Sequence, residues 1–183
     1  DLVRSRGLGD VYKRQLVMER DQSVDTAPSV GMYRFEVPVE LQGTYNSAGV
    51  ANLTASMEKE PNTLSMNVAH VKGNPSESYV VEIYKDLAAI ETHRKSDHYQ
   101  AFVNEVGSKL TNRKMYDVQS VLLFEKKDAL SIVNDGKAVV TLTEFTVDSN
   151  EIDTVQRQYQ LDMERAVRDD AGYKAGYVPV SYT

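Results

Sequence analysis

The sequence predicts an α+β fold in which strands and helices follow one another in the order βαββαβ. Four short segments alternate apolar with polar residues, which is the pattern of strands that bury one face. After the first and the third of these segments, apolar residues recur every three or four positions, as in amphipathic helices. The 183 residues are 41% hydrophobic and 26% charged, a balance typical of globular domains.

The first half of this predicted unit is a strand, a helix and a second strand. Residues 33–39 alternate as a strand, and residues 47–58 have apolar side chains at helical spacing. The Pro61-Asn62 pair ends the helix, because proline cannot continue its hydrogen bonds. Residues 64–69 alternate again and predict the second strand, which the Gly73-Asn74-Pro75 turn closes.

The second half is a third strand, two helices and a fourth strand. Residues 79–84 alternate, and Asp86 is placed to cap a short helix that ends at Arg94. Ser96 is placed to cap the next helix. The apolar stripe of that helix comprises Tyr99, Phe102, Val103, Val106 and Leu110. Met115–Lys126 then predicts the fourth strand, which completes a ferredoxin-like unit.

A second, incomplete copy of this unit follows the first. Val17-Met18-Glu19-Arg20 is similar to Leu123-Phe124-Glu125-Lys126, the end of the predicted fourth strand, and a polar linker follows each. We therefore expect residues 16–30 to be the end of a preceding repeat plus a linker. Residues 31–126 are expected to be one complete domain, and residues 127–183 a linker and the first half of another.

That half-domain is predicted as βαβ. Ala138–Val147 is rich in β-branched residues, Asn150–Asp169 has helical spacing, and Tyr173–Val180 begins another strand. Residues 1–15 stand apart, because from Ser5 onward they are similar to the translation of a transposase-type sequencing adapter. We expect this segment to be an artefact and the native N-terminus to be missing.

Composition excludes several classes of protein. The chain has no cysteine, and therefore no disulfide, thiolate nucleophile or cysteine-based metal site. A formal net charge of −6 with scattered Lys and Arg argues against nucleic acid as a partner. No apolar run is long enough to span a bilayer, so we expect no membrane partner. A cytoplasmic location is a separate expectation.

The most informative segment is Glu82–Phe102, which holds two of the three histidines. It reads Glu82-x-Tyr84-x-Asp86-x-x-Ala89-x-x-x-His93-x-x-Ser96-x-His98-Tyr99-x-x-Phe102. Together with Glu60-Pro61 before the second strand, this pattern resembles the antibiotic biosynthesis monooxygenase (ABM) domain family over residues 31–126. The resemblance extends more weakly over residues 137–183.

The resemblance implies a dimeric α+β barrel, in which two ferredoxin-like units enclose a cavity between their sheets. The two units could come from a homodimer or from repeats within one chain. Some family members oxygenate quinols or phenols with dioxygen and with no metal or flavin. The expected function is therefore a cofactor-independent monooxygenase acting on a small quinol or phenol. The alternatives are an isomerase or ligand-binding module on the same fold, and a purely structural repeat.

Strand alternation predicts which sheet face borders that cavity. The apolar sets of three strands suit the face that the helices cover. These sets are Tyr33/Phe35/Val37, Leu64/Met66/Val68 and Tyr79/Val81/Ile83. The opposite face would carry Arg34, Glu36, Asn67, Ala69, Val80, Glu82 and Tyr84. So polar a face suits a ligand pocket or, alternatively, the solvated face of an open monomer.

The expected catalytic residues are His93 and Glu82. Histidine takes up protons near neutral pH, and a carboxyl group in a dry pocket has a raised pKa. His93 could instead cap the end of its helix. The expected substrate-binding residues are Tyr84, Asn67, Arg34 and His98. His98, beside the apolar stripe, also suits a structural role. The spacing of the two histidines does not match a helical zinc-binding pair, so no metal site is expected.

Overall fold

The computed structural model describes residues 28–125, 139–173 and 175–180. The predicted artefact, residues 1–15, lies outside the described residues. So do most of the predicted segment 16–30 and the first part of the predicted segment 127–183, up to residue 138. The described residues form two compact units, residues 28–119 and residues 120–180, each with its own hydrophobic cluster.

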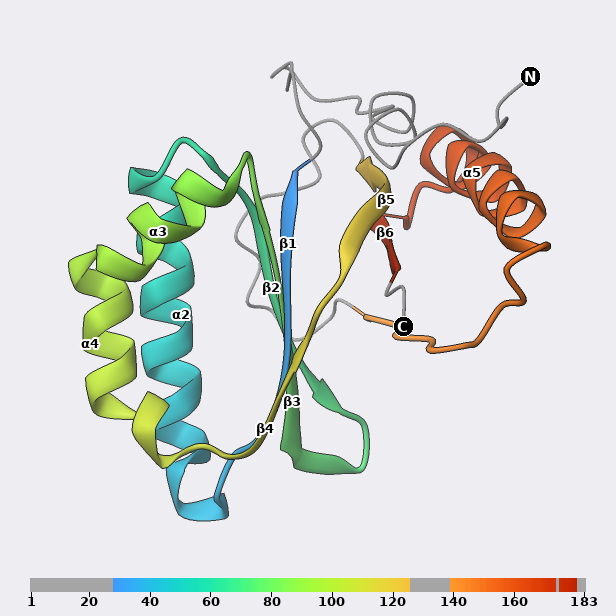
Figure 1. Ribbon diagram of the computed structural model, residues 1–183. Coiled ribbons are helices and arrows are strands. Elements are labelled where there is room, and N and C mark those ends of the chain that lie inside the picture. The colour runs from blue at the N-terminus through green and yellow to red at the C-terminus, as the bar shows by residue number, and fades with distance from the viewer. Residues whose placement is uncertain (1–27, 126–138, 174, 181–183) are drawn as a thin grey trace. The chain divides into compact units, whose positions relative to one another are not determined.

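The first unit is a four-stranded antiparallel sheet with helices on one face (Figure 1). The strand order across the sheet is β2-β3-β1-β4. The elements are β1 (Ser29–Glu36), η1 (Val39–Leu41), α2 (Gln42–Lys59), β2 (Thr63–Val71), β3 (Asn74–Tyr84), α3 (Leu87–Lys95), α4 (Asp97–Glu105), η2 (Gly107–Lys109) and β4 (Thr111–Tyr116). The predicted α+β, ferredoxin-like order is confirmed.

Polar caps define where α3 and α4 begin. The Asp86 side chain accepts a hydrogen bond from the Ala89 N–H at 2.9 Å, as its position in the sequence predicted. Ser96 accepts from the Tyr99 N–H at 3.3 Å and so begins α4. The Ser96 hydroxyl also donates to the His93 carbonyl oxygen at 2.7 Å, at the end of α3. One residue therefore ends one helix and starts the next.

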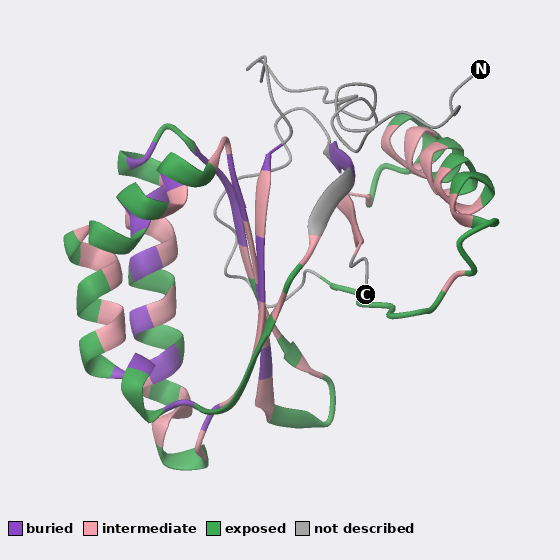
Figure 2. Ribbon diagram, in the orientation of Figure 1, coloured by how far each residue is buried: buried purple, intermediate pink, exposed green. Residues whose placement is uncertain are grey.

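The core of the first unit lies between the helices and the sheet. One cluster of its buried side chains comprises Val37, Tyr45, Ala48, Val106 and Leu110. Figure 2 shows buried positions along α2, which are Tyr45, Ala48, Asn52 and Ser56. The Tyr45 hydroxyl pairs with the Ser78 hydroxyl at 2.8 Å, which ties α2 to β3. Burying a side chain of this size stabilises the fold by about 1.5–3 kcal/mol.

Strand register shows which side chains share a sheet face, because directly paired residues of antiparallel strands point the same way. On β3, Ser78 contacts Tyr45 of α2, so its side chain faces the helices. Glu82 and Tyr84 follow at even spacing and face the same side. Glu82 also pairs with Met66 of β2, which is buried.

The orientation predicted for the third strand is therefore wrong, whereas β1 and β2 have the predicted orientation. Arg34 pairs with Tyr79 and Asn67 pairs with Val81, so these four lie on the face opposite the helices. Arg34 and Asn67 do not share a face with Glu82. Apolar residues occupy both alternating sets of β3, so alternation alone could not orient this strand.

The predicted fourth strand, residues 115–126, is divided into two strands in the structure. β4 ends at Tyr116 and pairs with β1 of the first unit. β5 (Gln119–Glu125) instead pairs with β6 (Ala175–Val180). The two halves of the predicted strand thus belong to different sheets.

The second unit contains the β5–β6 pair and α5 (Ile152–Asp169), which confirm the predicted helix and final strand. Leu122 and Phe124 are the buried members of its core. The side chains packed against them are Tyr159, Met163, Val167, Val178 and Val180.

One predicted strand of the second unit is not observed. Residues 139–147 of the predicted strand 138–147 have no regular secondary structure, and Val139 is 90% exposed. The β-branched composition predicted a strand, but a strand requires a hydrogen-bonded neighbour as well.

Within the described residues, no helix has the length and apolar character needed to cross a membrane.

Candidate active site

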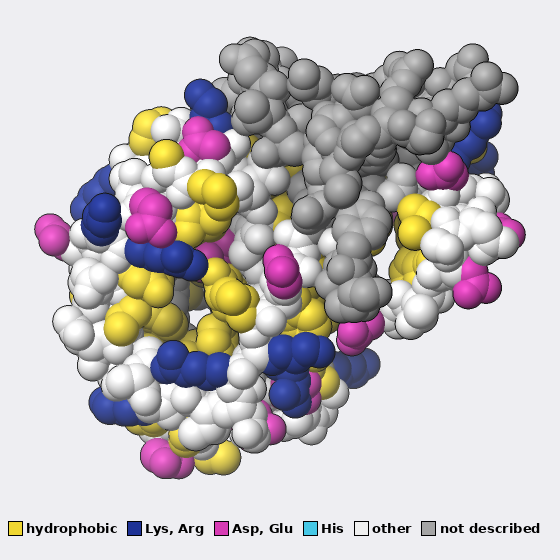
Figure 3. Space-filling view, viewed as in Figure 1, with side chains coloured by type: hydrophobic (Ala, Val, Ile, Leu, Met, Phe, Trp, Pro, Cys, Tyr) yellow, Lys and Arg dark blue, Asp and Glu magenta, His cyan; other side chains and the backbone are white. Residues whose placement is uncertain are grey.

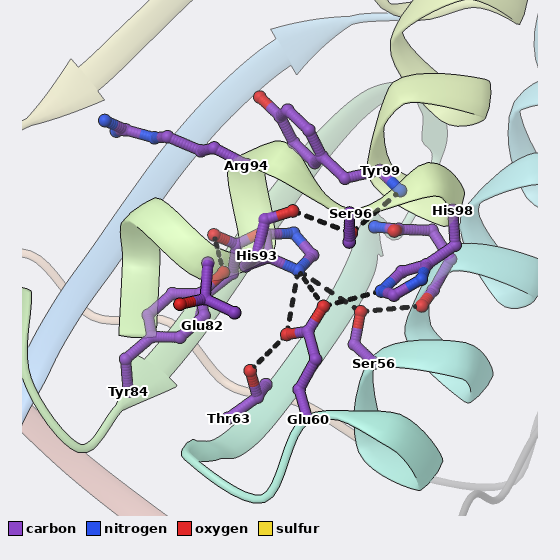
Figure 4. Close-up of polar contacts among 12 residues, drawn as sticks. Ser56, Glu60, Thr63, Glu82, Tyr84, His93, Arg94, Ser96, His98 and Tyr99 are labelled. Atoms are coloured by element: carbon purple, nitrogen blue, oxygen red, sulfur yellow. Dashed lines mark hydrogen bonds and ion pairs between the residues drawn. The ribbon is translucent and has the colours of Figure 1, made fainter. Parts of the chain in front are cut away.

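A carboxylate and two histidines meet in the first unit (Figure 4). His98 Nε2 lies 2.6 Å from Glu60 Oε1, and His93 Nδ1 lies 3.1 Å from both Glu60 oxygens. Glu60, His93 and His98 are 8%, 1% and 15% exposed. The Thr63 hydroxyl donates to Glu60 Oε2. Both carboxylate oxygens are therefore held by hydrogen bonds away from bulk solvent.

The ends of three helices bring these groups together. Glu60 is the residue at which α2 ends, and its N–H bonds the Ser56 carbonyl oxygen at 2.9 Å. Pro61 follows and prevents the helix from continuing. His93 lies in the last turn of α3, and His98 lies in the first turn of α4. The short connection between α3 and α4 therefore places both imidazoles against the same carboxylate.

The hydrogen bonds define which nitrogen of His93 carries the proton. The Ser56 hydroxyl donates to the Asn52 carbonyl oxygen at 2.8 Å, so its lone pairs face His93 Nδ1 at 3.3 Å. The Glu60 carboxylate faces the same nitrogen. Because both neighbours are acceptors, Nδ1 carries the proton and Nε2 carries the lone pair. Burial lowers the pKa of His93, against the opposing effect of Glu60, and so favours the neutral ring.

Glu60 is ionised at neutral pH. Burial by itself would raise its pKa, but the hydrogen bond from Thr63 and the two histidines outweigh burial and hold the pKa below its ordinary value. His93 Nε2 is buried and has no hydrogen-bond partner among the described residues. A free imidazole nitrogen whose opposite nitrogen is held by a carboxylate is the arrangement of a general base.

A second carboxyl group, Glu82, lies on the same sheet face. The Tyr84 hydroxyl donates to Glu82 Oε2 at 2.9 Å, and the Tyr84 ring centroid lies 5.6 Å from that of His93. Burial raises the pKa of Glu82 to about 7, although the Tyr84 hydrogen bond and the charge of Arg94 oppose the rise. The site therefore combines one ionised carboxylate with one that is partly protonated at neutral pH.

Aromatic side chains lie around this polar cluster. The ring centroids of Tyr99 and Tyr84 lie 4.8 Å and 5.6 Å from that of His93. Figure 3 shows a hollow between the helices and the sheet, bordered by hydrophobic side chains, with Lys or Arg side chains above and below it. In Figure 4, the Arg94 and Tyr99 side chains point away from the Glu60 carboxylate. Such surroundings suit a flat, mostly apolar ligand.

Glu60, His93 and His98 could also hold a divalent cation, since one ligand atom of each lies within 4.8 Å of the others. Two imidazoles and a carboxylate are a donor set for such ions. A metal-bound imidazole normally donates its other N–H to an acceptor, and His93 Nε2 has none within the described part of the chain. The hydrogen-bonded arrangement fits this ring better than a metal-bound one.

The structure brings together four of the predicted site residues, namely His93, Glu82, Tyr84 and His98. The other two lie on the opposite sheet face, where Arg34 pairs with Glu77 at 2.6 Å and Asn67 donates to Ser65 at 3.0 Å. The central residue, Glu60, was not predicted as a site residue. The available signal was the Glu60-Pro61 pair that contributed to the family resemblance.

The fold and the site define a ferredoxin-like α+β domain with a buried acid–histidine cluster. Residues 30–105 match the family model described as Antibiotic biosynthesis monooxygenase. The matched residues include Glu82–Phe102, the segment whose pattern indicated a resemblance to this family. A comparison with curated proteins finds no match.

Several solved structures are similar to this chain. A Lactobacillus acidophilus protein described as a "putative monooxygenase" matches with a TM-score of 0.69 at 15% identity, over 82% of this chain and 68% of that chain. A Bacteroides thetaiotaomicron protein described as an antibiotic biosynthesis monooxygenase, also "putative", matches at 23% identity with a TM-score of 0.48, over 49% of this chain and 86% of that one. A protein of the same description from Nitrosomonas europaea matches at 19% identity with a TM-score of 0.45, over 48% and 84%. At 15% identity the Lactobacillus match establishes the fold alone.

Proposed function

We propose that the first unit is a cofactor-independent monooxygenase that acts on a small phenol or quinol. One observation carries the proposal. The Glu60 carboxylate accepts the hydrogen bond of His93 Nδ1, so the buried Nε2, which has no partner among the described residues, can accept a proton. Glu60 is a positioning residue in this scheme. Arg34 and Asn67, on the other sheet face, have no part in it.

The first step is removal of the phenolic proton. A hydroxyl group beside Nε2 gives its proton to His93, and Glu60 stabilises the imidazolium that forms, as the acidic member of a catalytic triad does. The phenolate is far more electron-rich than the phenol, so it can give one electron to dioxygen. The apolar surroundings of the site strengthen these charge interactions by excluding water.

The remaining steps balance with dioxygen as the oxidant. The two radicals combine to form a C–O bond at a ring carbon, and the peroxide oxygen takes up a proton. The ring C–H proton is then lost, the O–O bond breaks, and the hydroxide leaves as water after gaining a proton. The carbon becomes a carbonyl. For 1-naphthol, the sum is naphthol plus dioxygen giving 1,4-naphthoquinone plus water.

Oxygen uptake with 1-naphthol and a panel of quinols tests this proposal. With ¹⁸O₂, the new carbonyl of the naphthoquinone carries one labelled oxygen. Because a general base contributes about 10²–10⁴ in rate, His93→Ala is expected to lose about that factor. Glu60→Gln is expected to lose up to about 10⁴-fold, as the loss of the acidic member of a catalytic triad does. His70→Ala is the matched control, because the exposed His70 pairs with Asn46 and contacts the edge of Tyr45, outside the acid–histidine cluster. No uptake across the panel, or equal rates in His93→Ala and wild type, contradicts the proposal.

The presence of His93 and Glu82 in one site also favours isomerisation as a second candidate function. A neutral base, His93, and a partly protonated acid, Glu82, can move a proton between neighbouring carbons of a small hydroxyketone. Solvent deuterium would then enter the ligand without oxygen uptake. Exchange in D₂O under nitrogen, lost in His93→Ala, distinguishes this function from the monooxygenase.

A further inference from the structure

Glu82 lies between β3 and the helices, and the charged and titratable groups around it come from several elements. Tyr84 of β3 donates to Oε2, and the Tyr33 hydroxyl of β1 is close enough to be affected by the Glu82 charge. Arg94 of α3 and Glu60, at the end of α2, act on it through space with opposite sign. Burial raises the pKa of Glu82 more than the charge of Arg94 lowers it, and the resulting pKa is about 7.

Glu60 and Glu82 are thus two carboxyl groups whose surroundings push their pKa values apart. Glu60 accepts hydrogen bonds from Thr63 and two imidazoles, which favour its ionised form. Glu82 has one hydroxyl donor, from Tyr84, in a desolvated position. When environments separate two carboxyl groups in this way, the ionised one stabilises charge and the protonated one donates protons.

The proposed reaction needs such a donor. His93 already holds the proton taken from the phenol when the O–O bond breaks. The departing hydroxide must gain a proton at that moment to leave as water, because hydroxide is a poor leaving group in an apolar site. The Tyr84 ring centroid lies 5.6 Å from that of His93, and the Tyr84 hydroxyl donates to Glu82 at 2.9 Å. Tyr84 therefore contacts both the base and the second carboxyl group.

We propose that Glu82 is the general acid of the site, which protonates the departing peroxide oxygen while Tyr84 positions its carboxyl group. This inference rests on the proposed monooxygenase function. The proton moves from the Glu82 carboxyl to the distal oxygen, the O–O electron pair leaves with that oxygen, and water departs. Two protons then remain, one from the ring C–H and one on His93. One of them restores the Glu82 carboxyl group through solvent, and the other replaces the proton that the peroxide oxygen took up. The two groups therefore have separate roles, and Glu82 is not an alternative base.

Glu82→Gln tests this role, because glutamine keeps an oxygen that can accept from Tyr84 but cannot donate an acidic proton. We expect labelled naphthoquinone formation to fall about 100-fold while the affinity for 1-naphthol is unchanged. Wild-type turnover is expected to fall as pH rises from 6 to 8, and this fall is expected to be absent in Glu82→Gln. Glu105→Gln, at an exposed position of α4, is the matched control. A wild-type rate and pH profile in Glu82→Gln would overturn the role of Glu82.

Tyr84→Phe gives a second measurement. The Tyr84 hydrogen bond lowers the pKa of Glu82, so its removal is expected to shift the loss of turnover to higher pH. A purely structural role for Tyr84 would lower the rate without moving the profile, and that result would overturn its positioning role.

Carbon-13 NMR of the Glu82 carboxyl group separates this inference from the proposed function. Titration near pH 7 in the resting protein is expected, and it needs no substrate. Titration in the ordinary carboxyl range would overturn the role of Glu82 even if the protein consumes oxygen. A wild-type protein without oxygen uptake would instead reject the proposed function, and this role of Glu82 with it.

Discussion

At the scale of single residues, the protonation of Glu82 is also a property of stability. Its folded pKa of about 7 lies above the ordinary value of 4.5, so between these pH values the folded state binds more protons than the unfolded state. Stability from this group is therefore fully present below pH 4.5 and is lost as pH rises through 7.

Glu82→Gln removes the cost of ionising this buried carboxyl group, because glutamine stays neutral at every pH. The variant is expected to be more stable than wild type at pH 8, by about 1–3 kcal/mol, because each pKa unit corresponds to about 1.4 kcal/mol. At pH 4, where Glu82 is protonated, the two proteins are expected to be equally stable. Urea unfolding at both pH values measures the difference. A stability difference that does not depend on pH would contradict the assigned pKa.

The residue types of the site could be predicted from sequence, but the contacts could not. His93 and Glu82 stand out because few side chains titrate near neutral pH when buried. Glu60 does not stand out, since its partner His93 is 33 residues further along the chain. The tautomer of His93 depends in addition on Ser56, another contact that no local pattern reveals.

At the scale of secondary-structure elements, the connection between α3 and α4 controls the site. The Ser96 hydroxyl donates to the last turn of α3 and accepts from the first turn of α4, and His93 and His98 lie on either side of it. Ser96→Ala is expected to cost about 0.5–2 kcal/mol through loss of the cap. It is also expected to shift the NMR signals of both imidazoles, because the two helices lose a shared anchor.

Asp86→Ala is the matched control for this prediction. Asp86 caps the start of α3, at the end remote from the histidines, through the Ala89 N–H. We expect a similar loss of stability, measured by thermal unfolding, with unchanged imidazole signals. Equal perturbation of the imidazoles in both variants would show that Ser96 acts only through helix stability.

The strands illustrate where alternation succeeds and where it fails. β1 and β2 place their apolar sets toward the helices as predicted, because each has a clear alternation. β3 has apolar residues in both sets and turns polar residues, Ser78 and Glu82, toward the helices. These polar groups are satisfied by partners from α2 and within β3, so a helix-facing position does not require an apolar side chain.

At the scale of the whole molecule, the sequence predicted the order of elements better than their grouping. The run 115–126 reads as one strand, yet β4 and β5 have partners in different sheets. Periodicity describes the local backbone and carries no information about which neighbour completes the ladder. The proposed division into a complete domain and a half-domain stays a prediction.

Oligomeric state is the last property that belongs to the whole molecule. The family resemblance predicts a dimer that joins the sheets through the face opposite the helices, where Ala69 pairs with Tyr79. Ala69→Arg places a long charged side chain on that face, and burying an unpaired charge in an interface costs several kcal/mol. Sedimentation equilibrium is expected to give twice the chain mass of 20.5 kDa for wild type and the chain mass for Ala69→Arg. Ala101→Arg, on the exposed surface of α4, is expected to remain a dimer. A monomeric wild type, or a dimer that survives Ala69→Arg, would show that this sheet face does not join two copies.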